Sequence, residues 1–139
     1  MVSIPVRYIH SNRSDQQISL LLQNIFVGEI LSPSRCIWLV SPWLSDLPVI
    51  KNDTNLFSSV DPSWTGRVIH ISELFSKLIS LGSTLHIAVR PIEINDHFCS
   101  VLNARIPCVE RDRLFIHRQD NLHEKGLLGD FYYLAGSMN

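Results

Sequence analysis

Five polar side chains recur at fixed spacing near the C-terminus, among apolar neighbours: His123, Lys125, Asp130, Ser137 and Asn139. On a strand, successive side chains alternate between the two faces, so His123 and Lys125 share one side. Ser137 and Asn139 share one side of a second strand for the same reason. Two glycines in the segment between the strands allow a turn that brings the pairs together. We therefore expect a nucleophilic imidazole, a cation and two hydrogen-bond donors to converge on one point.

These side-chain types suit the cleavage of a phosphodiester. Near neutral pH, His123 offers an unprotonated nitrogen that can attack phosphorus and form a covalent intermediate. The ammonium of Lys125 neutralises the non-bridging oxygens as charge builds up, and Ser137 and Asn139 donate hydrogen bonds to the same oxygens. Ionised Asp130 only accepts hydrogen bonds, so we expect it to hold Lys125 or a histidine. An aspartate that follows a glycine at a turn is also common for local hydrogen bonding alone.

The pattern His-x-Lys, four residues, Asp, five residues, Gly-Ser-x-Asn, over residues 123–139, resembles the signature of the phospholipase D superfamily. The resemblance implies that His123 is the nucleophile and forms a phosphohistidine. It also implies that Lys125, Ser137 and Asn139 bind the phosphate, beside Gly136, and that catalysis uses neither a metal nor another cofactor.

A complete site of this family uses two copies of the motif, with one histidine attacking and the other acting as general acid. This chain has one copy, because no other histidine has a lysine two positions later. The resemblance therefore implies a homodimer in which the two copies of His123 face each other across a two-fold axis. Family domains continue beyond the position of Asn139 with further strands and a carboxylate that orients the histidine. We expect a truncated product, completion by a partner protein, or a degenerate member.

The elements upstream of the motif predict a single α/β domain over residues 1–139. The continuous apolar run Cys36–Val40 predicts a strand buried on both faces of a sheet. Residues 51–66 are dense in turn formers, which predicts a long loop, and long loops are often functional. Other periodic or apolar stretches predict helices over 15–30 and 71–79, the latter ended by Gly82, a short helix capped by Asn95, and strands at 85–89 and 114–116. A mixed sheet flanked by helices follows, closed by the motif hairpin, and the resemblance implies the same phospholipase D-like α/β sandwich.

Two residues outside the motif follow predicted strands at their carboxyl ends, where open α/β sheets place ligand contacts. Trp43 could stack on a base or pack against a lipid headgroup, although a tryptophan beside a proline is more often a packing residue. Arg90 is a weaker candidate for phosphate binding. A basic cluster just before the motif would let a polyanion track there, but interspersed acidic residues favour a salt-bridged surface; it comprises Arg105, Arg111, Arg113 and Arg118.

Composition bounds the class of protein. The chain has 139 residues, 45% of them hydrophobic, which favours a globular domain, and its net charge of -1 excludes a broadly basic surface that coats nucleic acid. Its three cysteines are an odd number without zinc-ligand spacing, so we expect neither a disulfide framework nor a metal site, and a reducing cytoplasm fits best. No apolar run is long enough for a membrane span.

We expect a metal-independent phosphodiesterase, a nuclease acting on DNA or RNA as a homodimer. Residues 33–43 and 122–130 are also similar to a bacterial subgroup associated with deazaguanine DNA modification and phage defence, which implies partner proteins of such a system. Two alternatives stay open: a phospholipase or phosphatidyltransferase acting on lipids, and a catalytically inactive subunit that binds nucleic acid or serves assembly. The lipid alternative lacks an amphipathic helix with a basic face.

Overall fold

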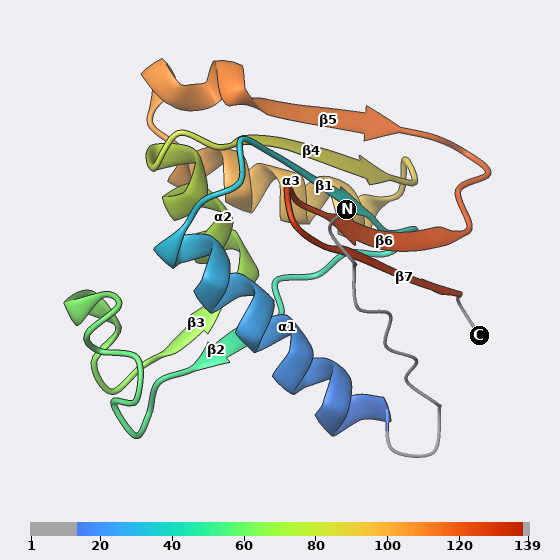
Figure 1. The fold of residues 1–139 in the computed structure, drawn as a ribbon. Helices are drawn as coiled ribbons and strands as arrows, with labels where there is room; N and C mark the ends of the chain where they lie inside the picture. Colours follow the sequence, from blue (N-terminus) through green and yellow to red (C-terminus); the bar gives the residue numbers. More distant parts are fainter. Residues whose placement is uncertain (1–13, 138–139) are drawn as a thin grey trace, which may run out of the picture.

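The computed structural model describes the backbone of residues 14–137 and the side chains of residues 17–136 (Figure 1). The helices are α1 (Ser14–Leu31), α2 (Ile71–Ser80) and α3 (Glu93–Arg105), with single 3-10 segments at Pro62–Trp64 and Cys108–Arg113. The strands are β1 (Cys36–Val40), β2 (Pro48–Lys51), β3 (Val68–His70), β4 (Thr84–Val89), β5 (Leu114–Arg118), β6 (Glu124–Leu128) and β7 (Tyr133–Ser137). None of these helices is long and apolar enough to cross a membrane.

Five strands form one mixed sheet in the order β5-β4-β1-β6-β7. β1, β4 and β5 run parallel, whereas β6 is antiparallel to β1 and forms a hairpin with β7. The carboxyl ends of the three parallel strands therefore lie at the same edge, where β6 begins. A small second sheet pairs β2 with β3. The predicted mixed α/β architecture and the closing hairpin are confirmed; the β2–β3 sheet was not predicted.

The described helices pack on one face of the five-stranded sheet. Alternate strand residues such as Ile37, Ile87 and Leu127 join a core with Phe26 of α1 and Phe75 of α2. Phe26 and Phe75 meet edge to face, with ring centroids 5.9 Å apart. This packing fixes which side of β6 faces the helices: the side that carries Leu127.

The opposite face of the sheet carries a row of rings. His86 stacks on Trp38 at 4.1 Å and on Phe115 at 4.8 Å between centroids. His86 Nδ1 and His117 Nε2 lie 3.0 Å apart, and partial burial together with the neighbouring His117 lowers the pKa of His86. Trp38 keeps partial solvent exposure, so the prediction that β1 is buried on both faces is wrong for this face.

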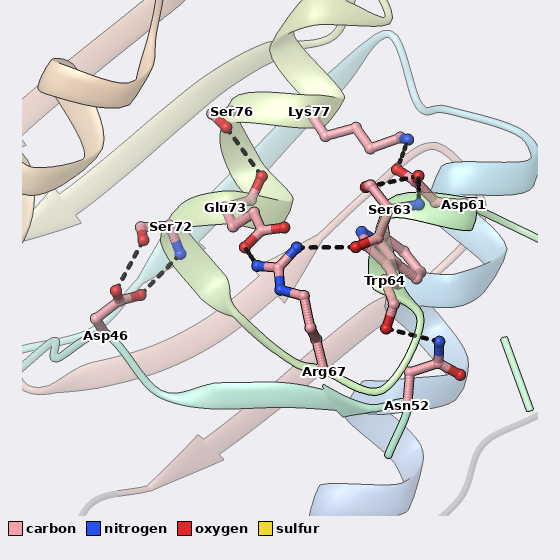
Figure 2. A network of polar contacts seen from close by, with 10 residues as sticks. All are labelled: Asp46, Asn52, Asp61, Ser63, Trp64, Arg67, Ser72, Glu73, Ser76 and Lys77. Atoms are coloured by element: carbon pink, nitrogen blue, oxygen red, sulfur yellow. Dashed lines mark hydrogen bonds and ion pairs between the residues drawn. The ribbon is translucent and has the colours of Figure 1, made fainter. Parts of the chain in front are cut away.

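The long segment after β2 is fixed in place, although it lacks strands and α-helices as predicted. The Asn52 side chain donates to the carbonyl of the fully buried Trp64 at 2.9 Å (Figure 2). Asp61 forms an ion pair with Lys77 of α2 and accepts from Ser63 at 2.8 and 2.9 Å. Burial alone would raise the pKa of Asp61, but the hydrogen bonds from Lys77 and Ser63 outweigh it and lower that pKa. These contacts support a structural role for the loop.

Helix ends follow the sequence only in part. Gly82 has a φ of +109° just beyond α2, so the predicted glycine stop is confirmed. α3 begins at Glu93 with Ile92 at its N-cap and no side-chain cap, so the predicted capping role of Asn95 is wrong. Asn95 lies inside the first turn and is fully buried. Its amide is hydrogen-bonded to the loop after β1 and to the loop after β4.

Candidate functional site

Three loops meet at the carboxyl ends of the parallel strands and bring Trp43, Arg90 and His123 together. Trp43 follows β1, Arg90 follows β4 directly, and His123 stands between β5 and β6. The Arg90 guanidinium carbon lies 5.2 Å from the centroid of the Trp43 ring, and Arg90 Nη2 lies 2.8 Å from His123 Nδ1. This is the edge of an α/β sheet at which ligands usually bind.

Arg90 is the centre of this group. Besides its contact with His123, its Nε donates to the carbonyl of Leu122 at 2.7 Å. One guanidinium therefore fixes both the backbone before the histidine and the imidazole ring. Trp43 is 49% exposed, which leaves room for a further stacking partner beside the guanidinium.

Asn95 positions the loops that carry Trp43 and Arg90. Its Nδ2 donates to the carbonyls of Pro42 and Arg90, at 2.7 and 3.0 Å, and its Oδ1 accepts from the amide of Leu44 at 2.7 Å. A buried amide that makes three hydrogen bonds to two loops is costly to replace, because the loop groups would lose their partners. The backbone at the site is thus rigid while the side chains stay at the surface.

Lys125 lies on the same side of β6 as the core residue Leu127, and His123 directly precedes the strand, two residues before Lys125. Both His123 and Lys125 are exposed. Among the described residues, Lys125 forms neither a side-chain hydrogen bond nor an ion pair. A strand advances about 3.3 Å per residue, so the two side chains start about 7 Å apart and can contact one phosphate.

The β6–β7 register sets Gly136 opposite Lys125 and Ser137 opposite Glu124. The glycine is therefore the position beside the lysine, where a Cβ would meet nothing within 4 Å. The Ser137 side chain and the whole of Asn139 lie outside the described residues. The predicted convergence of these two residues on His123 stays a prediction.

Asp130 lies at the other end of β6, away from His123 and Lys125. Its carboxylate accepts from the backbone amide of Arg35 at 2.9 Å, and its own amide donates to Ser34 Oγ at 2.9 Å. The expected contact with Lys125 or a histidine is absent from the described residues. The contacts of Asp130 therefore fit the second role that the sequence allowed, which is local hydrogen bonding at the turn of the hairpin.

A buried polar cluster surrounds that turn. Glu29 of α1 accepts from the amide and the hydroxyl of Ser34, at 3.1 and 2.5 Å. Burial, reinforced by Glu29, raises the pKa of the Tyr132 phenol. Gly129 is required here, since a Cβ would lie 2.5 Å from the Tyr132 ring and 2.8 Å from Ser34 Oγ. These residues attach the β6–β7 turn to the end of α1.

The contact with Arg90 decides which nitrogen of His123 carries the hydrogen. A guanidinium only donates, so Nδ1 accepts and the neutral ring carries its hydrogen on Nε2. A nucleophilic histidine needs the reverse: a lone pair on the attacking nitrogen and a hydrogen on the other, usually donated to a carboxylate or carbonyl. Among the described residues, no carboxylate is hydrogen-bonded to His123. In this state the lone pair of Nδ1 is engaged by Arg90 and Nε2 carries the hydrogen, so neither nitrogen has a free lone pair.

The sequence pointed to His123 with Lys125, to Trp43 and to Arg90, but not to the contacts that join Trp43, Arg90 and His123. It missed the role of Asn95 entirely. The contact of Trp43 with Arg90 could have been predicted from one feature: both residues follow apolar strands. Such residues lie at one edge of the sheet only if their strands are parallel neighbours. The register of β1 with β4 supplies that condition.

The remaining charged groups are partly paired. In the basic cluster, Arg113 lies 3.8 Å from Glu110 and Arg118 lies 3.1 Å from Asp96, consistent with the salt-bridged surface that the sequence favoured.

Within the described residues, no three His, Cys, Asp or Glu side chains gather as a metal site. A scan against protein-family models gives no match to this chain, and a search of curated proteins gives none either.

Proposed function

We propose that the protein is a metal-independent phosphodiesterase of phospholipase D type that cleaves nucleic acid. The observation that carries this proposal is the contact of His123 with Arg90, which lies against Trp43, at the carboxyl edge of the sheet, with the exposed Lys125 two residues further along the chain. Three cationic or basic side chains can bind a phosphate, and one exposed aromatic ring beside them can stack on the adjoining nucleic-acid base.

In the proposed reaction, His123 attacks phosphorus through Nε2. A P–N bond forms, the P–O bond to the leaving alcohol breaks, and a second histidine protonates the leaving oxygen. Water then attacks the phosphohistidine, its proton returns to the second histidine, and a phosphate monoester leaves. Lys125 and Arg90 neutralise the phosphoryl oxygens in both steps.

The second histidine comes, in this proposal, from another copy of the chain, because the sequence has one His-x-Lys motif. His86 and His117 are engaged with each other on the opposite face of the sheet. Two copies of His123 across a two-fold axis would exchange the roles of nucleophile and acid.

Cleavage assays test the activity directly. Plasmid DNA, single-stranded DNA and RNA are incubated with the protein in EDTA, alongside His123→Ala and phosphatidylcholine vesicles as a lipid substrate. We expect nucleic-acid cleavage that survives EDTA and falls at least about 10³-fold in His123→Ala. Loss of activity in EDTA with recovery in magnesium would contradict the mechanism, and cleavage of the lipid alone would replace the substrate class.

Subunit mixing tests the shared site. Wild-type protein is mixed with excess His123→Ala protein under conditions that allow subunit exchange, and total activity is followed. A shared site predicts that activity falls faster than the fraction of wild-type protomer. A strictly linear fall, or full activity in a monomeric sample, would show that one chain is sufficient.

A second candidate is a nucleic-acid-binding subunit without cleavage activity. The observation in its favour is the Arg90 contact, which places the hydrogen of His123 on the nitrogen that would have to attack. This candidate predicts salt-sensitive binding of single-stranded DNA or RNA, weakened in Lys125→Ala, with no product formed at any enzyme concentration.

A further inference from the structure

Arg90 carries a positive charge but contacts no anion among the described residues. Its partners are the imidazole of His123, the carbonyl of Leu122 and the ring of Trp43. All three are neutral when the ring is neutral. A guanidinium has five N–H donors in a planar fork that matches a phosphate, and the two acceptors here use only part of it.

The backbone of Arg90 is fixed while its head group is at the surface. Asn95 holds the Arg90 carbonyl at 3.0 Å, and the fully buried position of that amide leaves the loop little freedom. The guanidinium rests against the half-exposed Trp43 ring. A change of partner at Arg90 therefore needs side-chain rotation across an aromatic surface and no movement of the sheet.

We propose that Arg90 exchanges His123 for the phosphate of the substrate and thereby releases the ring for attack. The inference rests on the proposed function in one respect, namely that a phosphodiester is the ligand. In the free protein, Arg90 holds the hydrogen of His123 on Nε2. When a phosphate draws the guanidinium away, Nδ1 loses its donor and can take up a hydrogen itself.

The exchange is favourable because a phosphate is an anion that can accept two parallel N–H bonds from the planar guanidinium, whereas His123 Nδ1 is a single neutral acceptor. The ring gives the Nε2 proton to solvent and takes one from solvent at Nδ1, so no net charge is gained or lost. The lone pair is then on Nε2, where the proposed attack on phosphorus needs it. Substrate binding and activation of the nucleophile are coupled through one side chain.

Long-range proton–nitrogen NMR of the histidine rings tests this without turnover. The pattern of cross-peaks distinguishes the Nε2–H from the Nδ1–H form, and His123→Ala identifies the His123 signals by their disappearance. Inorganic phosphate serves as the probe. We expect the Nε2–H form in the free protein and a shift toward the Nδ1–H form as phosphate is added.

Three variants sharpen the measurement. Arg90→Met should remove the preference for the Nε2–H form even without phosphate and weaken phosphate binding by roughly ten- to a hundred-fold. Arg90→Lys keeps a donor and a charge but not the planar fork, so it should retain part of both effects. Arg35→Met, an exposed arginine just before β1 and so at the opposite edge of the sheet, is the matched control and should leave both quantities unchanged.

The outcomes separate this inference from the proposed function. A ring that stays in one form through the phosphate titration, or that is the same in Arg90→Met and wild type, overturns the role of Arg90 even if the protein cleaves nucleic acid. A phosphate-dependent change in a protein that cleaves nothing keeps the role of Arg90 in anion binding and overturns the phosphodiesterase. A mere structural role would lower the melting temperature of Arg90→Met without altering the ring of His123.

Discussion

The two ends of β6 differ in almost every property, although one short motif spans both. At its start, His123 and Lys125 are exposed, and the contacts of His123 are with a cation. Beyond its end, Gly129 and Asp130 sit against Ser34 in a turn attached to α1. The ends are roughly 20 Å apart, given the rise of a strand, so they cannot act on one ligand.

The difference teaches that spacing within a motif need not mean a shared task. At the start of β6, the exposed His123 is bound only by the side chain of Arg90 among the described residues, and a ligand could replace that contact. Such a site suits binding and chemistry. The turn has partners that are buried or lie on the backbone, such as the Glu29–Ser34 pair, which suits stability. Changes at the two ends should therefore alter different measured quantities.

After His123→Ala, the largest expected effect is that of Lys125→Ala at the start of β6. Loss of the ammonium should lower kcat/KM by about 10²- to 10³-fold, since a charged group that stabilises a transition state contributes on this order. The melting temperature should stay within about 1 °C, because an exposed side chain without described partners contributes little to folding.

Lys51→Ala is the matched control, since Lys51 is an exposed lysine on the outlying β2–β3 sheet. Cleavage assays and thermal melts of both variants check the comparison. Equal loss of activity in both would mean that general surface charge, and not the position of Lys125, drives the reaction.

At the turn, Gly129→Ala should act on stability. The added Cβ would lie 2.5 Å from the Tyr132 ring, so either the ring or the hairpin must shift. We expect a loss of roughly 2 kcal/mol in the free energy of unfolding, within the range of overpacked core positions. Gly28→Ala is the control: a Cβ there meets nothing within 4 Å in α1, so stability should rise by about 0.5–1 kcal/mol. Urea unfolding of the two variants measures both values, and a similar small change in each would refute the close approach at Gly129.

The sequence predicted much of the scaffold from local patterns. The 3.6-residue spacing of Ile71, Leu74, Phe75 and Leu78 indicated α2, and its buried face carries these side chains. Apolar runs indicated β1 and β4. β2 and β3 are only four and three residues long, too short to show a period, and β2 starts at a proline. Their pairing depends on residues brought together by the loop between them.

The candidate site could be predicted only as parts. Alternation predicted that His123 and Lys125 share one side; in the structure His123 directly precedes β6, and Lys125 lies on the side of β6 that carries Leu127. The Arg90–His123 contact joins positions 33 residues apart and exists because β4 and β6 lie on either side of β1, a consequence of sheet order. Asp130 meets the backbone of Arg35 across 95 residues, so no local pattern could separate its anchoring role from a catalytic one.

The smallest expected effect, and the sharpest test of the comparison, comes from Asp130→Asn. Asparagine keeps an oxygen that can accept from the Arg35 amide and removes only the charge. We expect the free energy of unfolding to fall by about 0.5–1 kcal/mol and kcat/KM to change by less than about three-fold. Asp130→Ala removes the acceptor too and should cost about 1–1.5 kcal/mol, because the Arg35 amide loses its side-chain partner. If Asp130→Asn instead abolished cleavage while its urea midpoint matched the wild type, the aspartate would act in the chemistry, and the division between the two ends of β6 would be wrong.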